Sequence, residues 1–129
     1  MAKTFMDMVK EAREEVGTVT PQEAQQLMEC DSNALVVDVR EPDDIASTGA
    51  IPGSLNVPLG MLAIRADQQL PESMRNEQLQ DRSRPILTTC AAGGQASLAA
   101  KTLKDMGFEN VKIIEGGTKG WKDAGLSTE

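Results

Sequence analysis

Short runs of apolar and β-branched residues alternate with helical patterns along this chain, and this alternation constrains its fold more than any other feature. The apolar runs predict strands at 18–20, 35–39, 55–57, 85–89 and 111–114. Between and around them, periodicity of apolar residues predicts helices at 4–15, 21–29, 96–106 and about 118–124, with one or two short helices within 60–82. Strands that alternate with helices are typical of an α/β fold with a mainly parallel sheet.

Local signals also place helix ends and one boundary. Thr20 followed by Pro21 and Glu23 is the pattern of an N-cap, a proline in the first turn and a capping box, so a helix should begin there. Gly107 is expected to end the helix that precedes it. The 129 residues are enough for one domain. We expect a helical N-terminal extension over residues 1–16 and a single α/β domain over 17–129.

The absence of histidine among the 129 residues excludes several kinds of site. Ser-His-Asp and Cys-His catalysis both need an imidazole, and so do histidine-based metal sites. Two distant cysteines, Cys30 and Cys90, cannot supply the four thiolates of an all-cysteine zinc site, and they do not form a disulfide framework. No metal and no cofactor is therefore expected.

The charge balance argues against two classes of partner. A net charge of −7 and a pI near 4.6 leave no basic stripe for nucleic acid and no basic patch for anionic lipid. No run of eighteen apolar residues is present, and the charged, amphipathic N-terminus lacks the features of a signal peptide. The sequence predicts a cytoplasmic protein.

Cys90 stands directly after the predicted strand 85–89 and before a loop of small residues that leads into a helix. Ligands of open α/β sheets bind at the carboxyl ends of strands. The residues of the loop are small enough for the backbone to curl and turn several N–H groups inward: Ala91, Ala92, Gly93, Gly94 and Gln95. Such a nest at a helix start favours negative charge, so Cys90 should exist more as a thiolate and hold a persulfide. The alternative is a small buried cysteine beside a tight turn.

Several stretches together resemble the rhodanese family over roughly residues 17–126. They are 36–42 (VVDVREP), 49–58 (GAIPGSLNVP), the loop 90–95 (CAAGGQ) and 115–121 (EGGTKGW). The resemblance implies a three-layer sandwich with a five-stranded, mainly parallel sheet flanked by helices. It implies that Cys90 attacks a sulfane sulfur, becomes a persulfide and passes the sulfur to an acceptor in a two-step cycle. Residues 91–95 would bind substrate, and Asp38 and Arg40 would support the loop.

The loop departs from the family pattern in its charge. Gln95 lies where many members place Arg, and no cation is present from Ala91 to Gln95. Binding of dianionic thiosulfate should be weak, which favours a polysulfide or a protein persulfide as donor. A thiol, cyanide or a sulfur-carrier protein would be the acceptor. In addition, Ala50 replaces a frequent His.

Two other functions are alternatives to the sulfurtransferase. One is a non-catalytic rhodanese-like module that carries sulfur or binds a partner. The other is phosphatase chemistry in a related fold, which needs an Arg six residues after the cysteine; that position is Ala96.

The remaining polar and aromatic residues are interpreted as structural. Asp38 and Arg40 are expected to form an ion pair that holds the following turn, and Trp121 to anchor the last helix in the core. Lys119 and Lys122 are expected to be solvated near the mouth of the site. For Cys30 a structural role is favoured over that of a resolving thiol.

Overall fold

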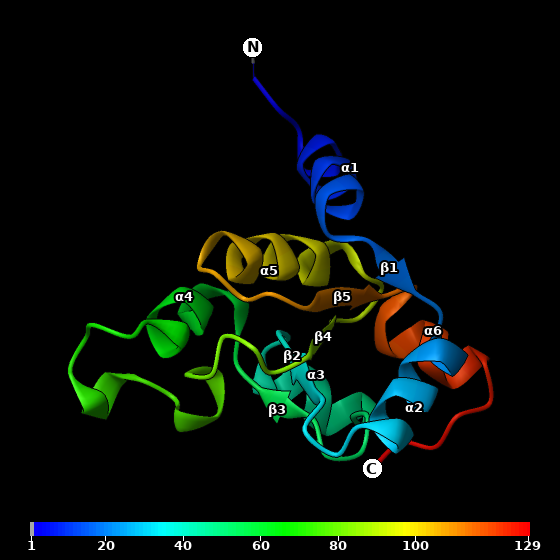
Figure 1. Ribbon diagram of the computed structural model, residues 1–129. Helices are drawn as coiled ribbons and strands as arrows, with labels where there is room; N and C mark the ends of the chain where they lie inside the picture. The colour runs from blue at the N-terminus through cyan, green and yellow to red at the C-terminus, as the bar shows by residue number, and fades with distance from the viewer. Residues whose placement is uncertain (1) are drawn as a thin grey trace.

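The strands form one parallel sheet. The computed structural model describes residues 2–129, and within them the sheet has five strands in the order β1-β5-β4-β2-β3, with every neighbouring pair parallel (Figure 1). Their bounds are β1 (Thr18–Val19), β2 (Leu35–Asp38), β3 (Leu55–Asn56), β4 (Ile86–Thr89) and β5 (Val111–Ile114). β4 is therefore the central strand, with β5 on one side and β2 on the other.

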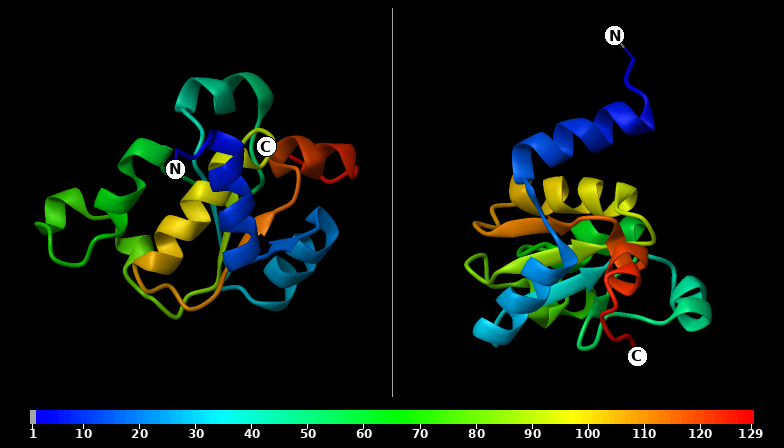
Figure 2. Two further views of the ribbon diagram at one scale, coloured as in Figure 1. Left: turned by 90° about the horizontal axis from the view of Figure 1, so that it is seen from above. Right: turned by 90° about the vertical axis from the view of Figure 1, so that its right-hand side faces the viewer.

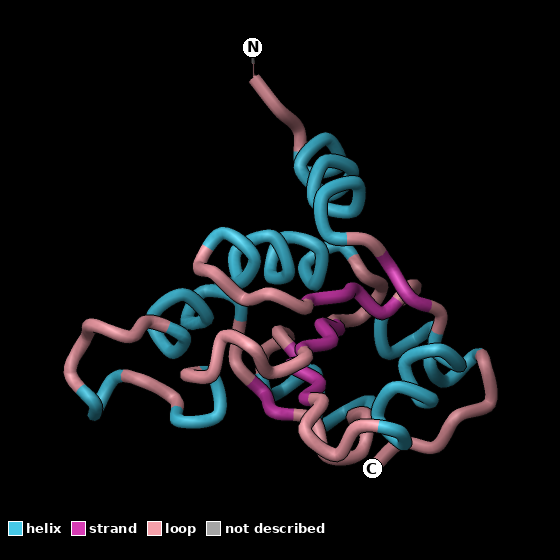
Figure 3. The backbone as a smooth tube through the Cα atoms, in the orientation of Figure 1, coloured by secondary structure: helices cyan, strands magenta, loops and turns pink. Residues whose placement is uncertain are grey.

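Helices connect the strands and cover the sheet (Figure 3). The α-helices are α1 (Phe5–Val16), α2 (Pro21–Cys30), α3 (Pro42–Thr48), α4 (Leu62–Ala66), α5 (Gly94–Asp105) and α6 (Gly117–Asp123). Three single turns of 3₁₀-helix are η1 (Leu59–Met61), η2 (Glu72–Met74) and η3 (Glu77–Leu79). None of the helices within residues 2–129 is both long and apolar enough to cross a bilayer.

Alternating side chains of the strands build two cores, one on each face of the sheet. Leu35 and Val37 of β2 pack on one face with the buried residues of α4 and α5, whereas Val36 packs on the other face with Ala24 of α2 and Trp121 of α6. This is the period of two expected of strands covered on both faces. The result is three layers: in Figure 1, α4 and α5 lie on the left of the sheet and α2 and α6 on its right, and α1 lies on the outer side of α5 (Figure 2).

Local capping explains where α1 and α2 begin. The hydroxyl of Thr20 accepts a hydrogen bond from the Glu23 N–H at 3.1 Å, and the Glu23 carboxylate accepts one from the Thr20 N–H at 2.9 Å. Thr4 and Asp7 form the same capping box at the start of α1. The predicted helix start at Thr20 is confirmed.

The predicted α/β class and five-stranded sheet are confirmed, and the sheet is parallel throughout rather than mainly parallel. Two helical details differ from the prediction. α3 was not predicted, although Pro42 in its first turn and the following Asp43 and Asp44 are typical of a helix start. α5 begins at Gly94 rather than Ala96, so Gly94 and Gln95 belong to the first turn of the helix and not to the loop.

Candidate active site

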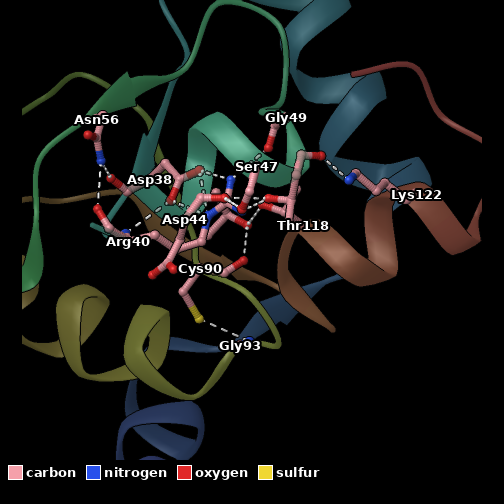
Figure 4. Close-up of polar contacts among 12 residues, drawn as sticks. Asp38, Arg40, Asp44, Ser47, Gly49, Asn56, Cys90, Gly93, Thr118 and Lys122 are labelled. Atoms are coloured by element: carbon pink, nitrogen blue, oxygen red, sulfur yellow. Dashed lines mark hydrogen bonds and ion pairs between the residues drawn. The ribbon is translucent and has the colours of Figure 1, made fainter. Parts of the chain in front are cut away.

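Cys90 lies at the carboxyl end of the central strand β4 and its sulfur faces two main-chain amides. The Gly93 N–H donates to Cys90 Sγ at 3.0 Å and the Ala96 N–H donates at 3.3 Å (Figure 4 shows the first of these). Cys90 is only 2% exposed. The sulfur is thus enclosed, but by N–H donors that stabilise negative charge on it rather than by apolar atoms alone.

The backbone of the loop bends at Gly93, which has the left-handed φ of +105°. A side chain is strained in this conformation, and glycine adopts it freely. The bend turns the Gly93 N–H back toward Cys90, and the hydroxyl of Ser97 donates to the Gly93 carbonyl at 2.7 Å to hold it. Glycine at position 93 therefore permits the bend that directs its own N–H at the sulfur.

The start of α6 holds the other side of the loop. The Thr118 N–H donates to the Cys90 carbonyl at 2.8 Å, and the Lys119 N–H donates to the Ala91 carbonyl at 3.1 Å. Gly117, at φ +62°, lies so close that a Cβ atom there would be 2.7 Å from the Cys90 carbonyl oxygen. This crowding explains why a glycine is needed at position 117 of the 115–121 motif.

A buried pair of threonines completes this junction. The hydroxyls of Thr89 and Thr118 lie 3.0 Å apart, and the Thr89 hydroxyl also lies 3.3 Å from the Cys90 carbonyl, to which it donates. Both residues are buried. Sequence reasoning missed both threonines, because nothing in the sequence pattern links positions so far apart in the chain.

The predicted loop residues differ in their access to solvent. Ala91, Ala92 and Gln95 are exposed and form the rim, whereas Gly93 is buried beneath them. Gln95 donates no hydrogen bond to the sulfur in the structure, and none of the residues from 91 to 95 carries a charge.

Asp38 and Arg40 form a buried, bidentate ion pair at the end of β2 (Figure 4). Arg40 Nη2 lies 2.7 Å from Asp38 Oδ2, and Arg40 Nε lies 3.0 Å from Asp38 Oδ1. Arg40 also donates to the hydroxyl of Thr48 and to the Gly49 carbonyl, which ties α3 to the strand. The hydrogen bonds to Asp38 raise the pKa of the Arg40 guanidinium, despite its burial, with smaller contributions from the charges of Asp38, Asp44 and Cys90.

This pair holds the turn after β2, as expected of a structural ion pair. Arg40 makes no hydrogen bond to residues 91–95. Asn56, which sequence reasoning did not single out, strengthens the same turn. Its amide donates to the carbonyls of Asp38 and Arg40 at 2.9 and 2.8 Å.

A shallow cavity of about 260 Å³ lies beside the loop, between α3 and α6, and is lined by Arg40, Thr48, Ala91, Thr118, Lys119 and Lys122. The two lysines near the loop already have partners. Lys119 forms an ion pair of 2.8 Å with Asp123, and Lys122 donates to the Thr48 carbonyl. Three cationic side chains thus line the cavity, each with its charge partly satisfied by protein oxygens.

The two remaining residues of interest lie away from the sulfur. Trp121 is buried in the core that also contains Ala24 and Val36, and its indole N–H donates to the Ser127 carbonyl at 2.8 Å, as expected of an anchor for the last helix. Cys30 is an exposed, free thiol at the end of α2.

Comparison with known proteins identifies relatives over most of the chain. The family model described as "Rhodanese-like domain" matches residues 20–124. A rhodanese domain-containing protein of Drosophila melanogaster is 32% identical over 88 residues, which cover 67% of this chain and 79% of that protein. Several other curated relatives are longer, and the chain spans only 20% to 27% of their length.

Two solved structures are similar over nearly the whole chain. A protein of unknown function from Rhodopseudomonas palustris, described as a possible tyrosine phosphatase, is 35% identical with a TM-score of 0.91, and the alignment covers 100% of this chain and 96% of that one. The polysulfide-sulfur transferase homodimer from Wolinella succinogenes is 26% identical with a TM-score of 0.77, covering 97% of this chain and 86% of that one.

Proposed function

The chain belongs to the rhodanese family, whose members similar to it include sulfurtransferases, and from this premise we propose that it is a sulfurtransferase carrying a sulfane sulfur as a persulfide on Cys90. The observation that carries the proposal is the pair of main-chain amides, from Gly93 and Ala96, that donate to the Cys90 sulfur. These fixed dipoles stabilise a sulfur anion without any ionisable base, which suits a chain that has no histidine.

The cycle has two displacement steps. In the first, the Cys90 thiolate attacks the outer sulfur of the donor; the new S–S bond forms on Cys90, and the donor's S–S bond breaks with its electron pair leaving on the donor. In the second, an acceptor thiolate or cyanide attacks the outer sulfur of the persulfide, and the Cys90 thiolate leaves with the electrons of the broken bond. The Gly93 and Ala96 amides stabilise the anion on Cys90 at the beginning and at the end.

The charges around the loop favour certain donors. Residues 91–95 are uncharged, and the nearby Lys119 and Lys122 are engaged with Asp123 and the Thr48 carbonyl. A dianion such as thiosulfate therefore finds no free cation held against the sulfur. We propose a polysulfide or a protein persulfide as the main donor, with a thiol or a sulfur-carrier protein as acceptor.

Phosphatase chemistry is not favoured, although one similar structure is described as a possible tyrosine phosphatase. A phosphate loop needs a guanidinium to pair with the phosphate oxygens, and the residue six after Cys90 is the buried Ala96, whose N–H donates to the sulfur. Arg40, the one arginine that is buried within residues 2–129, is committed to Asp38, Thr48 and Gly49.

Mass spectrometry tests the proposal directly. Treatment with polysulfide should add one sulfur to the peptide that contains Cys90, and cyanide or a thiol should remove it. Cys90→Ser should abolish the adduct, whereas Cys30→Ser, at the exposed thiol on α2, should leave it unchanged. If no sulfane donor adds sulfur at Cys90, the chain is a non-catalytic rhodanese-like module.

The donor proposal has its own test. Gln95→Arg places a cation on the exposed rim of the loop and should lower the KM for thiosulfate. Gln26→Arg makes the same change of charge on the exposed side of α2 and serves as the control. An equal KM for the two variants would contradict the argument from loop charge.

A further inference from the structure

The first residue of α1, Phe5, lies against Gly94 in the first turn of α5, directly after the loop that surrounds Cys90. Gly94 lies between the two amides that face the sulfur, those of Gly93 and Ala96. A Cβ atom on Gly94 would be 2.9 Å from Cζ and 3.1 Å from Cε2 of Phe5. Gly94 has no positive φ, so its conformation does not require glycine. The space that a side chain would fill is instead taken by the Phe5 ring, with Val9 also nearby at 3.9 Å.

α1 is fixed in place by contacts other than those of Phe5. Its buried residues Val9, Ala12 and Val16 face the domain, and α1 lies across α5 (Figure 2). At the far end of α1, Lys101 of α5 pairs with Glu15 at 3.4 Å and Lys104 donates to the Glu15 carbonyl at 2.8 Å. The Thr4 and Asp7 capping box fixes the end where Phe5 begins the helix.

Phe5 itself contributes little to the core, because it remains 47% exposed. The part of the ring that is not in solvent lies where a Gly94 side chain would be, beside the two amides that face the sulfur. The helix that presents it also precedes residues 20–124, the part of the chain that the family model matches.

We propose that Phe5 is a positioning residue of the sulfur site. Its ring contacts Gly94 and holds the first turn of α5 so that the Gly93 and Ala96 amides stay directed at Cys90 Sγ. Helix α1 thereby extends the site beyond the family domain. This inference rests on the proposed sulfurtransferase function for its catalytic meaning, but its structural content can be tested separately.

Amide hydrogen exchange measured by NMR on the full chain tests the structural content. Phe5→Ala should speed exchange of the Gly93 and Ala96 amides about fivefold, as expected when one modest contact is lost. The amides of Val39 and Ile86, which donate to the Thr89 and Asn110 carbonyls, report on global unfolding and should not change.

Two variants of α1 serve as comparisons for Phe5→Ala. Met6→Ala shortens a neighbouring apolar side chain that is 64% exposed, and it should leave exchange at Gly93 and Ala96 unchanged. Phe5→Leu keeps an apolar contact and should restore slow exchange. Unchanged exchange in Phe5→Ala, or equal acceleration at Val39 and Ile86, would overturn the inference, because the first shows no restraint and the second shows only a general loss of stability.

The rate of persulfide transfer provides the second test. Phe5→Ala should lower kcat about threefold to tenfold, since even a 1 Å misplacement can cost about a hundredfold. Gly94→Ala, which pushes against the ring, should lower it as well, and the double variant should be no slower than the slower single variant. Additive losses would show that the two residues act independently, which contradicts the proposal.

The two tests separate this inference from the proposed function. If Phe5→Ala loosens the two amides and yet the wild-type chain accepts no sulfur, the proposed function fails and the positioning contact remains. If the wild-type chain forms the persulfide normally and Phe5→Ala changes neither exchange nor kcat, the inference about Phe5 fails alone.

Discussion

The buried pair of Asp38 and Arg40 offers the sharpest prediction about stability. Asp38 is fully buried, and its carboxylate accepts hydrogen bonds from Arg40 Nε, from Arg40 Nη2 and from the Arg40 main-chain N–H. Arg40→Met removes both side-chain donors and leaves a buried carboxylate with a single N–H partner. Breaking a buried pair in this way costs about 3–5 kcal/mol, a large part of the roughly 5–15 kcal/mol that stabilises a domain.

Urea unfolding followed by tryptophan fluorescence measures this cost. Trp121 is the single tryptophan and is buried in the core, so its emission reports on the whole domain. With an m-value of about 2 kcal/mol per molar urea, a loss of about 4 kcal/mol lowers the midpoint by about 2 M. Lys119→Met is the control, because it breaks a pair with Asp123 whose side chains are 74% and 65% exposed, and it should lower the midpoint far less than Arg40→Met does.

A double variant separates the attraction of the pair from the cost of leaving one charge alone. Asp38→Leu combined with Arg40→Met removes both charges and should recover most of the stability lost in Arg40→Met, because apolar replacement of a buried pair is often close to neutral. A midpoint for Arg40→Met no lower than that of Lys119→Met would refute the reasoning, since it would mean that solvent already reaches the Asp38 carboxylate.

Three further predictions follow from other contacts. Gly117→Ala should destabilise the domain by more than about 1 kcal/mol in the same urea assay and should impair persulfide formation, because the new Cβ would have a positive φ and would clash with the Cys90 carbonyl. Gly53→Ala is the control, because Gly53 has a positive φ but open space around it, so this variant measures the backbone cost alone. Asn56→Ala should cost about 1–2 kcal/mol, because the Arg40 carbonyl loses its donor while the Asp38 carbonyl keeps only the Val57 N–H; thermal unfolding measures this cost. The hydrogen bond from the Thr20 N–H lowers the pKa of Glu23 below its usual 4.5. The Glu23 carboxylate therefore stabilises α2 fully above pH 4.5, and this stabilisation is lost as the pH falls through the lowered pKa of the folded protein. An NMR titration midpoint for Glu23 at or above 4.5 would contradict this.

Much of the secondary structure was predictable because its causes are local. The β-branched runs at β2, β4 and β5 specify strands buried on both faces, and Thr20, Pro21 and Glu23 specify a helix start within four residues. α3 was also predictable in principle from Pro42 and the two acidic residues after it.

The predicted start of α5 at residue 96 was wrong for a different reason. Two consecutive glycines favour a loop when only local propensity is considered. Gly94 is nevertheless helical, and the Phe5 ring occupies the space where its side chain would be. The contact joins residues at opposite parts of the chain, so no window of neighbouring residues carries it.

The sequence by itself determined the alternation of strands and helices, the absence of any imidazole, and the placement of one cysteine at the end of the central strand, because periodicity and residue chemistry are properties of the chain alone. Only the tertiary structure decided which groups surround that cysteine. The amides of Gly93 and Ala96 face its sulfur, the Thr118 N–H donates to its carbonyl, and Gly117 leaves room for that carbonyl. Hydrogen bonds and close contacts depend on distances between segments, and those distances exist only after the sheet has brought the segments together.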